Sequence, residues 1–128
     1  MTQSWRSYGI MTTTPSSTAC NPGDVVLVPF KFAGSDQAKN RPAVIVSVAA
    51  YNDSRDDAVM VALTASRAPL YFGDCPIADW RAAGLPKPST SKGVVRTIEK
   101  ALVYQRLGSL TDEDMERVKD SLRAIMAL

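Results

Sequence analysis

Short apolar runs separated by turn-forming residues make up most of the chain after residue 22. β-Branched and aromatic residues in runs of this length favour strands over helices. Strands this short and close together, with no helical pattern between them, predict a small β-barrel. Pro42 precedes the second run, a position that suits the first residue of a strand. The runs lie at 24–30, 43–48, 58–64 and 94–98, with a weaker one at 70–77 and a further short one at 101–107.

The end of the chain has a helical pattern instead. Thr111 is a good N-cap, and the three acids that follow it favour the positive end of a helix dipole. Apolar residues then recur at helical spacing, which predicts a helix that covers one side of the barrel. The connections between the earlier runs contain turn formers, among them 34–36, Tyr51–Ser54 and the Pro/Gly-rich segment 82–91.

The chain divides into two parts. Residues 1–22 are rich in Ser and Thr and poor in large apolar residues, which predicts a flexible leader. Residues 23–128 then form one barrel domain, since a chain of 128 residues buries a single core. No apolar run approaches the roughly 20 residues that a membrane-spanning helix needs.

Composition excludes several classes of chemistry. The chain has no histidine, so imidazole acid/base catalysis, a Ser-His-Asp triad and His-ligated metals are excluded. Its two cysteines are too few for a zinc site, so we expect neither a metal nor another cofactor. Unpaired thiols suit a cytoplasmic protein. Residues 1–110 carry twelve bases and eight acids, and residues 111–128 three bases and five acids, so the body accommodates an anionic partner.

Seven segments carry a resemblance to a known family, and together they span about residues 23 to 127. Taken in the order in which they occur along the chain, these segments resemble the PemK/MazF family of toxins. Trp80, Ala83–Leu85 and Lys87–Ser89 form the loop segment, and Val95–Lys100 matches an Arg-Thr-Ile/Leu-Asp-Lys strand end. The remaining segments are Gly23–Val28, Gly34–Ala38, Arg41–Ser47, Ala62–Ser66 and Leu107–Glu113.

The resemblance implies an SH3-like small barrel of the PemK/CcdB type with a C-terminal α-helix, usually a homodimer. It implies the toxin of a toxin–antitoxin module, a sequence-selective, metal-independent endoribonuclease (an mRNA interferase) that cleaves single-stranded RNA. It also implies a cognate antitoxin protein that blocks the RNA groove.

Three residues match positions to which the family assigns catalysis. Arg41 matches the catalytic Arg, and a guanidinium can hold two phosphate oxygens and stabilise the charge that develops on phosphorus. Thr64 matches the catalytic Thr, whose hydroxyl can donate to a phosphate oxygen. Asp36 stands where many members carry Glu, one methylene longer, and is placed to accept the 2′ proton or to orient Arg41. The structural alternatives are a surface arginine, a strand-favouring threonine and a turn-forming aspartate.

Further residues are candidates for RNA binding. Gln37 suits contact with a base edge, and Ser66 has hydroxyl chemistry similar to that of Thr64. Lys39, Lys92 and Arg96, with Lys87, suit a phosphate track, although most charged side chains are simply solvated. Trp80 suits the core or a dimer interface better than base stacking.

Two other functions stay open. One is a catalytically inactive PemK-like module that binds RNA or antitoxin. The other is a gyrase-targeting toxin like CcdB, which is thought to act through a C-terminal Trp-Gly-Ile. This chain ends Met126-Ala127-Leu128, which argues against that mode.

Overall fold

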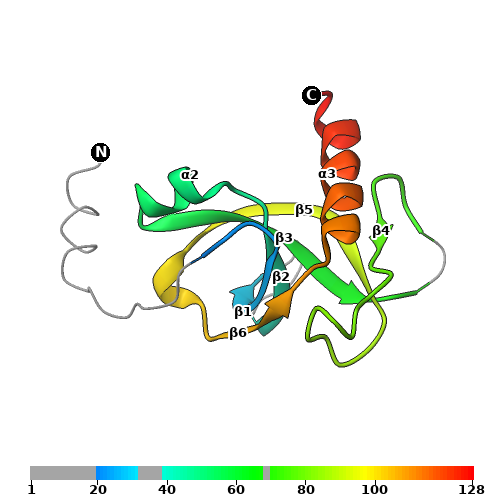
Figure 1. The fold of residues 1–128 in the computed structure, drawn as a ribbon, viewed down its shortest axis with the longest axis horizontal. Helices are drawn as coiled ribbons and strands as arrows, with labels where there is room; N and C mark the ends of the chain where they lie inside the picture. The colour runs from blue at the N-terminus through cyan, green and yellow to red at the C-terminus, as the bar shows by residue number, and fades with distance from the viewer. Residues whose placement is uncertain (1–19, 32–38, 68–69) are drawn as a thin grey trace.

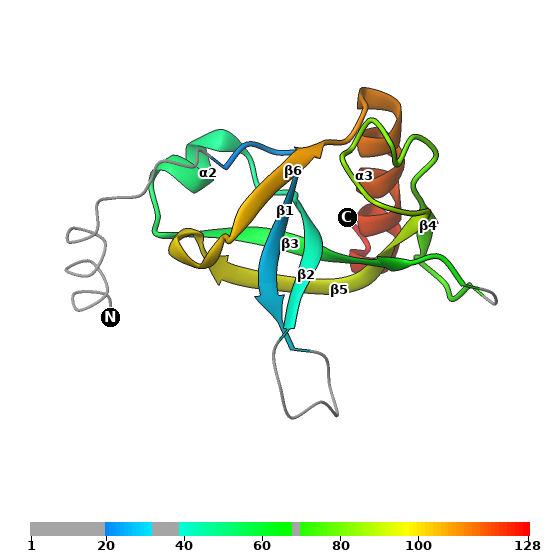
Figure 2. The ribbon, with the colours of Figure 1, turned by 90° about the horizontal axis from the view of Figure 1, so that it is seen from below.

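In the computed structural model, which describes residues 20–31, 39–67 and 70–128, six strands form one curled antiparallel sheet. β1 and β2 cross β3 and β5 steeply in Figure 2, so the sheet curls into a half-barrel. This confirms the predicted mainly β fold with a C-terminal helix. The strands are β1 (Asp24–Phe30), β2 (Lys39–Ile45), β3 (Asp57–Ala65), β4 (Cys75–Pro76), β5 (Ser89–Glu99) and β6 (Gln105–Ser109), in the order β4-β5-β3-β2-β1-β6.

Both faces of the central strands are buried. Successive side chains of a strand point to opposite faces, so Val25 and Val26 of β1 enter different core clusters. The first cluster includes Phe30, Ile45 and Met60. This burial on both sides is why β1 has a continuous apolar sequence. The second cluster lies between the sheet, the 77–85 loop and the C-terminal helix, and its members include Val44, Leu63, Ile77, Ala83, Leu85, Met115 and Val118.

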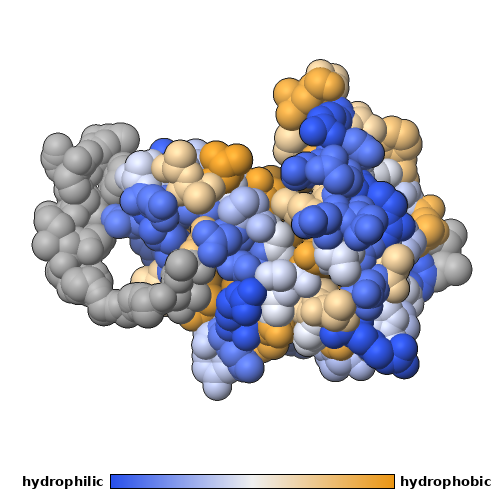
Figure 3. Space-filling view, viewed as in Figure 1, coloured by the Kyte–Doolittle hydropathy of each residue, from blue (hydrophilic) through white to orange (hydrophobic). Residues whose placement is uncertain are grey.

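The C-terminal helix α3 (Asp112–Met126) forms as the sequence predicts and stands against the β4–β5 side of the sheet in Figure 1. The Thr111 side chain accepts a hydrogen bond from the Asp114 backbone N–H at 3.2 Å and caps the first turn. Met115 and Val118 are buried against the second cluster. The outward face of α3 is mostly hydrophilic, and apolar residues gather at its C-terminal end (Figure 3).

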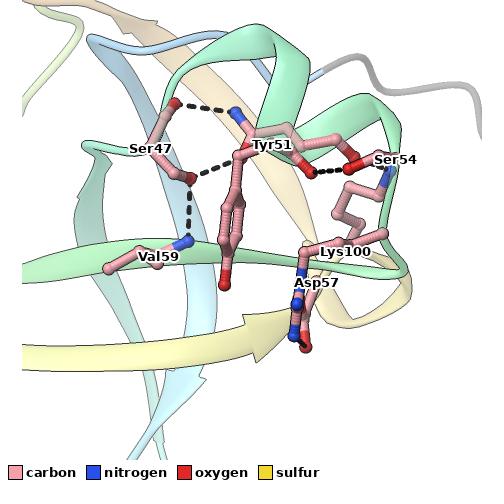
Figure 4. A network of polar contacts seen from close by, with 8 residues as sticks. Ser47, Tyr51, Ser54, Asp57, Val59 and Lys100 are labelled. Carbon is pink, nitrogen blue, oxygen red and sulfur yellow. Dashed lines mark hydrogen bonds and ion pairs between the residues drawn. The ribbon is translucent and has the colours of Figure 1, made fainter. Parts of the chain in front are cut away.

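A polar network ties the first described residues to the sheet. Asn52 is fully buried, donates from Nδ2 to the Cys20 carbonyl at 2.8 Å and accepts from Ser47 Oγ. Lys100 Nζ donates to the Asn52 carbonyl at 2.6 Å. Ser47 Oγ accepts from the Val59 N–H at 2.9 Å, as Figure 4 shows. This network stabilises a short helix, α2 (Ala49–Asp53), where we expected a loop over residues 51–54.

Three other element boundaries differ from the prediction. The strand expected at 94–98 begins earlier, at Ser89, because the polar segment 89–91 is buried and pairs with β3. Hydrophobic runs cannot reveal a buried polar strand. The strand expected at 70–77 reduces to β4, and the one at 101–107 becomes a 3-10 turn, η2 (Lys100–Leu102), followed by β6.

The predicted leader lies outside the described residues up to Ala19, and for these it stays a prediction. Cys20, which that prediction included, is only 3% exposed and packs in the first core cluster. Among the helices in the described ranges, none is long and apolar enough to cross a bilayer.

Candidate functional site

The candidate site opens where β2 and β3 separate. The ladder between them ends at Ala43. The Val46 N–H donates to the Val59 carbonyl at 2.9 Å, and alternate residues of a strand face the same neighbour, so Pro42 also faces β3. Proline has no N–H to donate, which ends the ladder. β2 nevertheless continues to pair with β1 as far as Lys39.

Pro42 therefore does not open its strand, as we expected, but lies within it. β2 begins three residues earlier, at Lys39. Pro42 pairs with Leu27 of β1, and on that side no donor is required of it. The missing donor matters only toward β3, where the chain makes a groove instead of a ladder.

Arg41 and Thr64 face each other across this opening. Ala43 pairs with Ala62, and the same register continued for two residues places Arg41 opposite Thr64. Both side chains are half-buried and line a groove of about 660 Å³. The structure thus brings two of the three catalytic candidates together. The other described residues of this groove are Leu27, Asn40, Pro42, Leu63, Ala65, Arg67, Gly84, Pro86, Lys87, Ser89 and Leu107.

The groove is cationic. Arg41, Arg67 and Lys87 line it, and its described lining contains no carboxylate. The ion pairs found among the described residues do not involve Arg67 or Lys87. Arg41 Nε is buried, so this guanidinium sits partly within the protein and is less screened by water. A surface of this kind attracts an anion such as a phosphodiester.

A second cavity, of about 270 Å³, continues from the groove. Thr64, Ala65 and Arg67 line both, so the site is elongated around the end of β3. Lys92 lies in this second cavity, as do Thr90, Leu70 and Tyr71. Ser66 is adjacent, since its Oγ lies 2.7 Å from Thr90 Oγ1.

The remaining predicted site residues lie elsewhere. Asp36 and Gln37 are outside the described residues. Lys39 is exposed at the start of β2 and lines neither cavity. Arg96 is exposed on β5, where it donates to the Val95 carbonyl at 3.0 Å and also lines neither cavity.

Sequence analysis missed Arg67, Asn40 and Tyr71. Arg67 follows the Ala62–Ser66 motif directly, so its position just past a functional strand end was a usable signal. Asn40 precedes Arg41 and lies between two of the expected strands. Tyr71 belonged to a stretch that we expected to be a strand, and only the fold shows it at the rim of a cavity.

Metal-ligating side chains do not gather in the described ranges, where no group of three His, Cys, Asp or Glu residues could hold an ion. Burial raises the pKa of both the Cys20 and Cys75 thiols. A buried thiol with a raised pKa stays protonated at neutral pH and reacts poorly. Cys75 packs in the second core cluster as a small hydrophobe.

The loop that forms one wall of the groove is held closely against the sheet. A Cβ on Gly84, whose φ is +80°, would lie 2.0 Å from the Leu107 carbonyl oxygen. Gly108 approaches the loop from the other side, where its Cβ would lie 2.6 Å from the Ala83 oxygen. The buried Asp114 carboxylate accepts from the Ala78 and Asp79 N–H groups at 3.0 and 2.9 Å and fastens the loop to α3.

Trp80 anchors the same loop. It is half-buried and packs against the second core cluster, and the Arg81 guanidinium lies 4.3 Å from its ring centroid. The expectation of a core role for Trp80 agrees with this packing. Trp80 is absent from the described lining of both cavities.

Comparison with known proteins identifies a family. A family model for PemK-like, MazF-like toxins of type II toxin–antitoxin systems matches residues 21–126. No curated protein matches the sequence. Solved structures share the fold at low identity. MazF from Deinococcus radiodurans is 22% identical with a TM-score of 0.71, covering 88% of this chain and 100% of that chain.

Two mycobacterial structures are similar in the same way. An endoribonuclease from Mycobacterial species is 20% identical with a TM-score of 0.70, covering 89% of this chain and 97% of that one. An endoribonuclease in complex with its cognate antitoxin, also from Mycobacterial species, is 21% identical with a TM-score of 0.68, covering 84% and 95%.

The close backbone contact at Gly84 gives a stability prediction. Gly84→Ala should lower the free energy of unfolding by about 2–4 kcal/mol, since it adds both a strained φ and a clash with backbone. Gly93→Ala is the matched control. Its Cβ would meet only the tip of the Ile125 side chain at 3.0 Å, so the change should stay below about 1 kcal/mol. Urea unfolding measures both, and equal midpoints would contradict the close packing.

Proposed function

The chain belongs to the PemK-like, MazF-like toxins of type II toxin–antitoxin systems, and we propose that it is a toxin endoribonuclease that cuts single-stranded RNA at selected sequences without a metal ion. The observation that carries this proposal is the placement of Arg41 and Thr64 opposite each other in a cationic groove.

The proposed reaction uses the ribose 2′-OH as the nucleophile. The 2′ oxygen forms a bond to phosphorus, the bond from phosphorus to the 5′ oxygen breaks, and the products carry a 2′,3′-cyclic phosphate and a 5′-OH. Negative charge builds on the phosphate oxygens in the transition state, and fixed donors aimed at that charge are usually the largest catalytic contribution. Arg41 supplies two such donors from its guanidinium, and Thr64 supplies a hydroxyl.

Two protons have to move. Asp36 is proposed either to accept the 2′ proton or to orient Arg41, because the described lining of the groove offers no carboxylate. As a guanidinium, Arg41 is a poor base. Its roles are charge stabilisation and donation toward the leaving 5′ oxygen.

Binding of the RNA strand is proposed to extend along the groove. Arg67 and Lys87 join Arg41 as phosphate contacts, with Lys92 in the second cavity and Ser66 beside it. Lys39 and Arg96 lie outside both cavities and contribute long-range attraction. Gln37 is proposed to contact a base edge.

An antitoxin protein is proposed as the partner that occludes this groove in the cytoplasm. One mycobacterial endoribonuclease of the same fold is solved in complex with its cognate antitoxin. Neither alternative function is favoured, since the matching family is that of PemK and MazF and the groove holds both matched catalytic candidates.

A first experiment tests the reaction itself. The purified chain should cut a long natural RNA at discrete sites in excess EDTA, as mapped by primer extension. A short RNA spanning one cut should yield a 2′,3′-cyclic phosphate, and a 2′-deoxy nucleotide on the 5′ side of the cut should stop cleavage. Cutting that continues on the deoxy substrate would show that water is the nucleophile. Cutting that requires Mg²⁺ would contradict a metal-independent reaction.

Arg41→Lys separates catalysis from charge. Lysine keeps the charge that attracts RNA but loses the planar pair of donors, so the rate should fall by about 10²–10³-fold, or roughly 3–4 kcal/mol. RNA affinity should change far less. Single-turnover cleavage and filter binding measure the two quantities. The control is Arg123→Lys on the exposed side of α3, which should cut at the parental rate, and a similar rate for Arg41→Lys would remove Arg41 from the active site.

A homodimer is proposed because the sheet ends in open edges. β4 and β6 are the edge strands of the sheet formed by the described residues, and unpaired edges favour association with another chain. Light scattering at micromolar concentration should give twice the 13.8 kDa chain mass. A monomer in that measurement would contradict the proposal while leaving the groove of one chain intact.

A further inference from the structure

An exposed aromatic turn lies beside the groove, between β3 and β4. Tyr71 and Phe72 are 72% and 82% exposed. Exposed aromatic side chains that border a cavity are typical of binding surfaces. The two residues differ in one respect, since Tyr71 lines the second cavity and Phe72 lines neither.

The turn is held in place although its side chains are exposed. Asp74 Oδ2 accepts from the Tyr71 N–H at 2.9 Å, and the Asp74 N–H donates to the Tyr71 carbonyl at 3.0 Å. Ser121 of α3 donates from Oγ to the Gly73 carbonyl, and Gly73 adopts the φ of +88° that this tight turn requires. The backbone that presents the Tyr71 ring is therefore ordered before any ligand binds, which reduces the entropy lost on binding.

A cation is held beside the same ring. Lys92 Nζ lies 2.5 Å from Asp74 Oδ2 and 5.3 Å from the centroid of the Tyr71 ring. One carboxylate thus fixes both the aromatic turn and the ammonium group. Because Asp74 balances the charge of Lys92, the positive charge of the second cavity comes mainly from Arg67, which lines both cavities.

The floor of the cavity offers hydrogen-bonding hydroxyls. Thr90 lines the cavity, and its Oγ1 lies 2.7 Å from Ser66 Oγ, with either atom able to donate. These groups match three features of a nucleotide. The ring suits the flat face of the base, the guanidinium suits the phosphate, and the hydroxyl pair suits the polar edge of the base. A phosphate ion alone would need no ring, and an apolar peptide would need no cation.

We propose that Tyr71 stacks on one unpaired nucleobase of bound RNA, with Arg67 on the adjoining phosphate, in the second cavity. The proposal rests on the proposed RNA-cleaving function and adds a binding subsite to it. Since Thr64 lines both cavities, an RNA strand held at Arg41 and Thr64 can continue into this subsite along one surface. Stacking of this kind tolerates any base, so the subsite adds affinity more than sequence selectivity.

The test uses a short RNA that spans a mapped cut and carries a 2′-deoxy nucleotide there, so that it binds without being cleaved. 2-Aminopurine replaces one base at a time, because its fluorescence is quenched when it stacks. With the parent chain, one position should be quenched on binding. Tyr71→Phe keeps a ring and should preserve the quenching. Tyr71→Ala should abolish it and weaken binding by about 5- to 150-fold, the equivalent of about 1–3 kcal/mol.

Phe72→Ala is the matched control, since it removes a similarly exposed ring from the same turn but outside the cavity. It should bind and quench as the parent does. If Tyr71→Ala also binds and quenches as the parent does while the parent still cuts RNA, the subsite is wrong and the cleavage function stands. That result is expected if Tyr71 instead anchors a protein partner. Equal losses for Tyr71→Ala and Phe72→Ala would likewise overturn the assignment. A parent chain that neither cuts nor binds RNA would overturn both proposals.

Discussion

The position of the candidate site depends on one missing hydrogen-bond donor. Pro42 lies within β2, facing β3, at the point where the ladder between these strands ends. Any residue other than proline would supply a backbone N–H at this position. The pairing of β2 with β3 could then extend over the space that the groove occupies. The sheet stays intact on the other side, where β1 pairs with β2 up to Lys39. A stable barrel and an open cleft therefore share the same strand.

The described walls of the groove are tied to different parts of the fold. Its floor consists of strand ends whose neighbouring residues are fully buried, such as Ala43 and Ala62. Its loop wall rests backbone to backbone on β6 at Gly84 and Gly108, and Asp114 fastens it to α3. Fixed donors at a reacting phosphate need such support, because reorganisation during the reaction would cost part of their stabilising effect.

Charge is distributed unevenly around this site. Cations line the groove, and no carboxylate appears among its described lining residues. Three acidic groups of α3 pair instead with bases on their own helix, namely Asp114 with Arg117, Glu116 with Lys119 and Asp120 with Arg123. Asp74 pairs with Lys92 and holds its ammonium group beside the Tyr71 ring. The cations of the groove are thus separated from the ion-paired acids of the helix.

Local sequence determined most of the elements. Continuous apolar runs predicted β1 and β3, since those strands draw their stability from buried side chains. Thr111 and the three acids after it predicted the start of α3. The family motifs singled out Arg41 and Thr64 in the same way. The start of β5 was missed, because Ser89, Thr90 and Ser91 are polar residues buried by the fold around them.

Only the tertiary structure decided what these residues do together. Arg41 and Thr64 are 23 positions apart, and the antiparallel register of β2 with β3 is what sets them opposite each other. The sequence marked Pro42 as a strand boundary, but which neighbour lost its hydrogen bond followed from the order of strands in the sheet. Tyr71 was part of an expected strand, and it became the rim of a cavity because Asp74 and α3 hold its turn there. Contacts between residues far apart in the chain depend on register and on strand order, and neither is encoded in a local pattern.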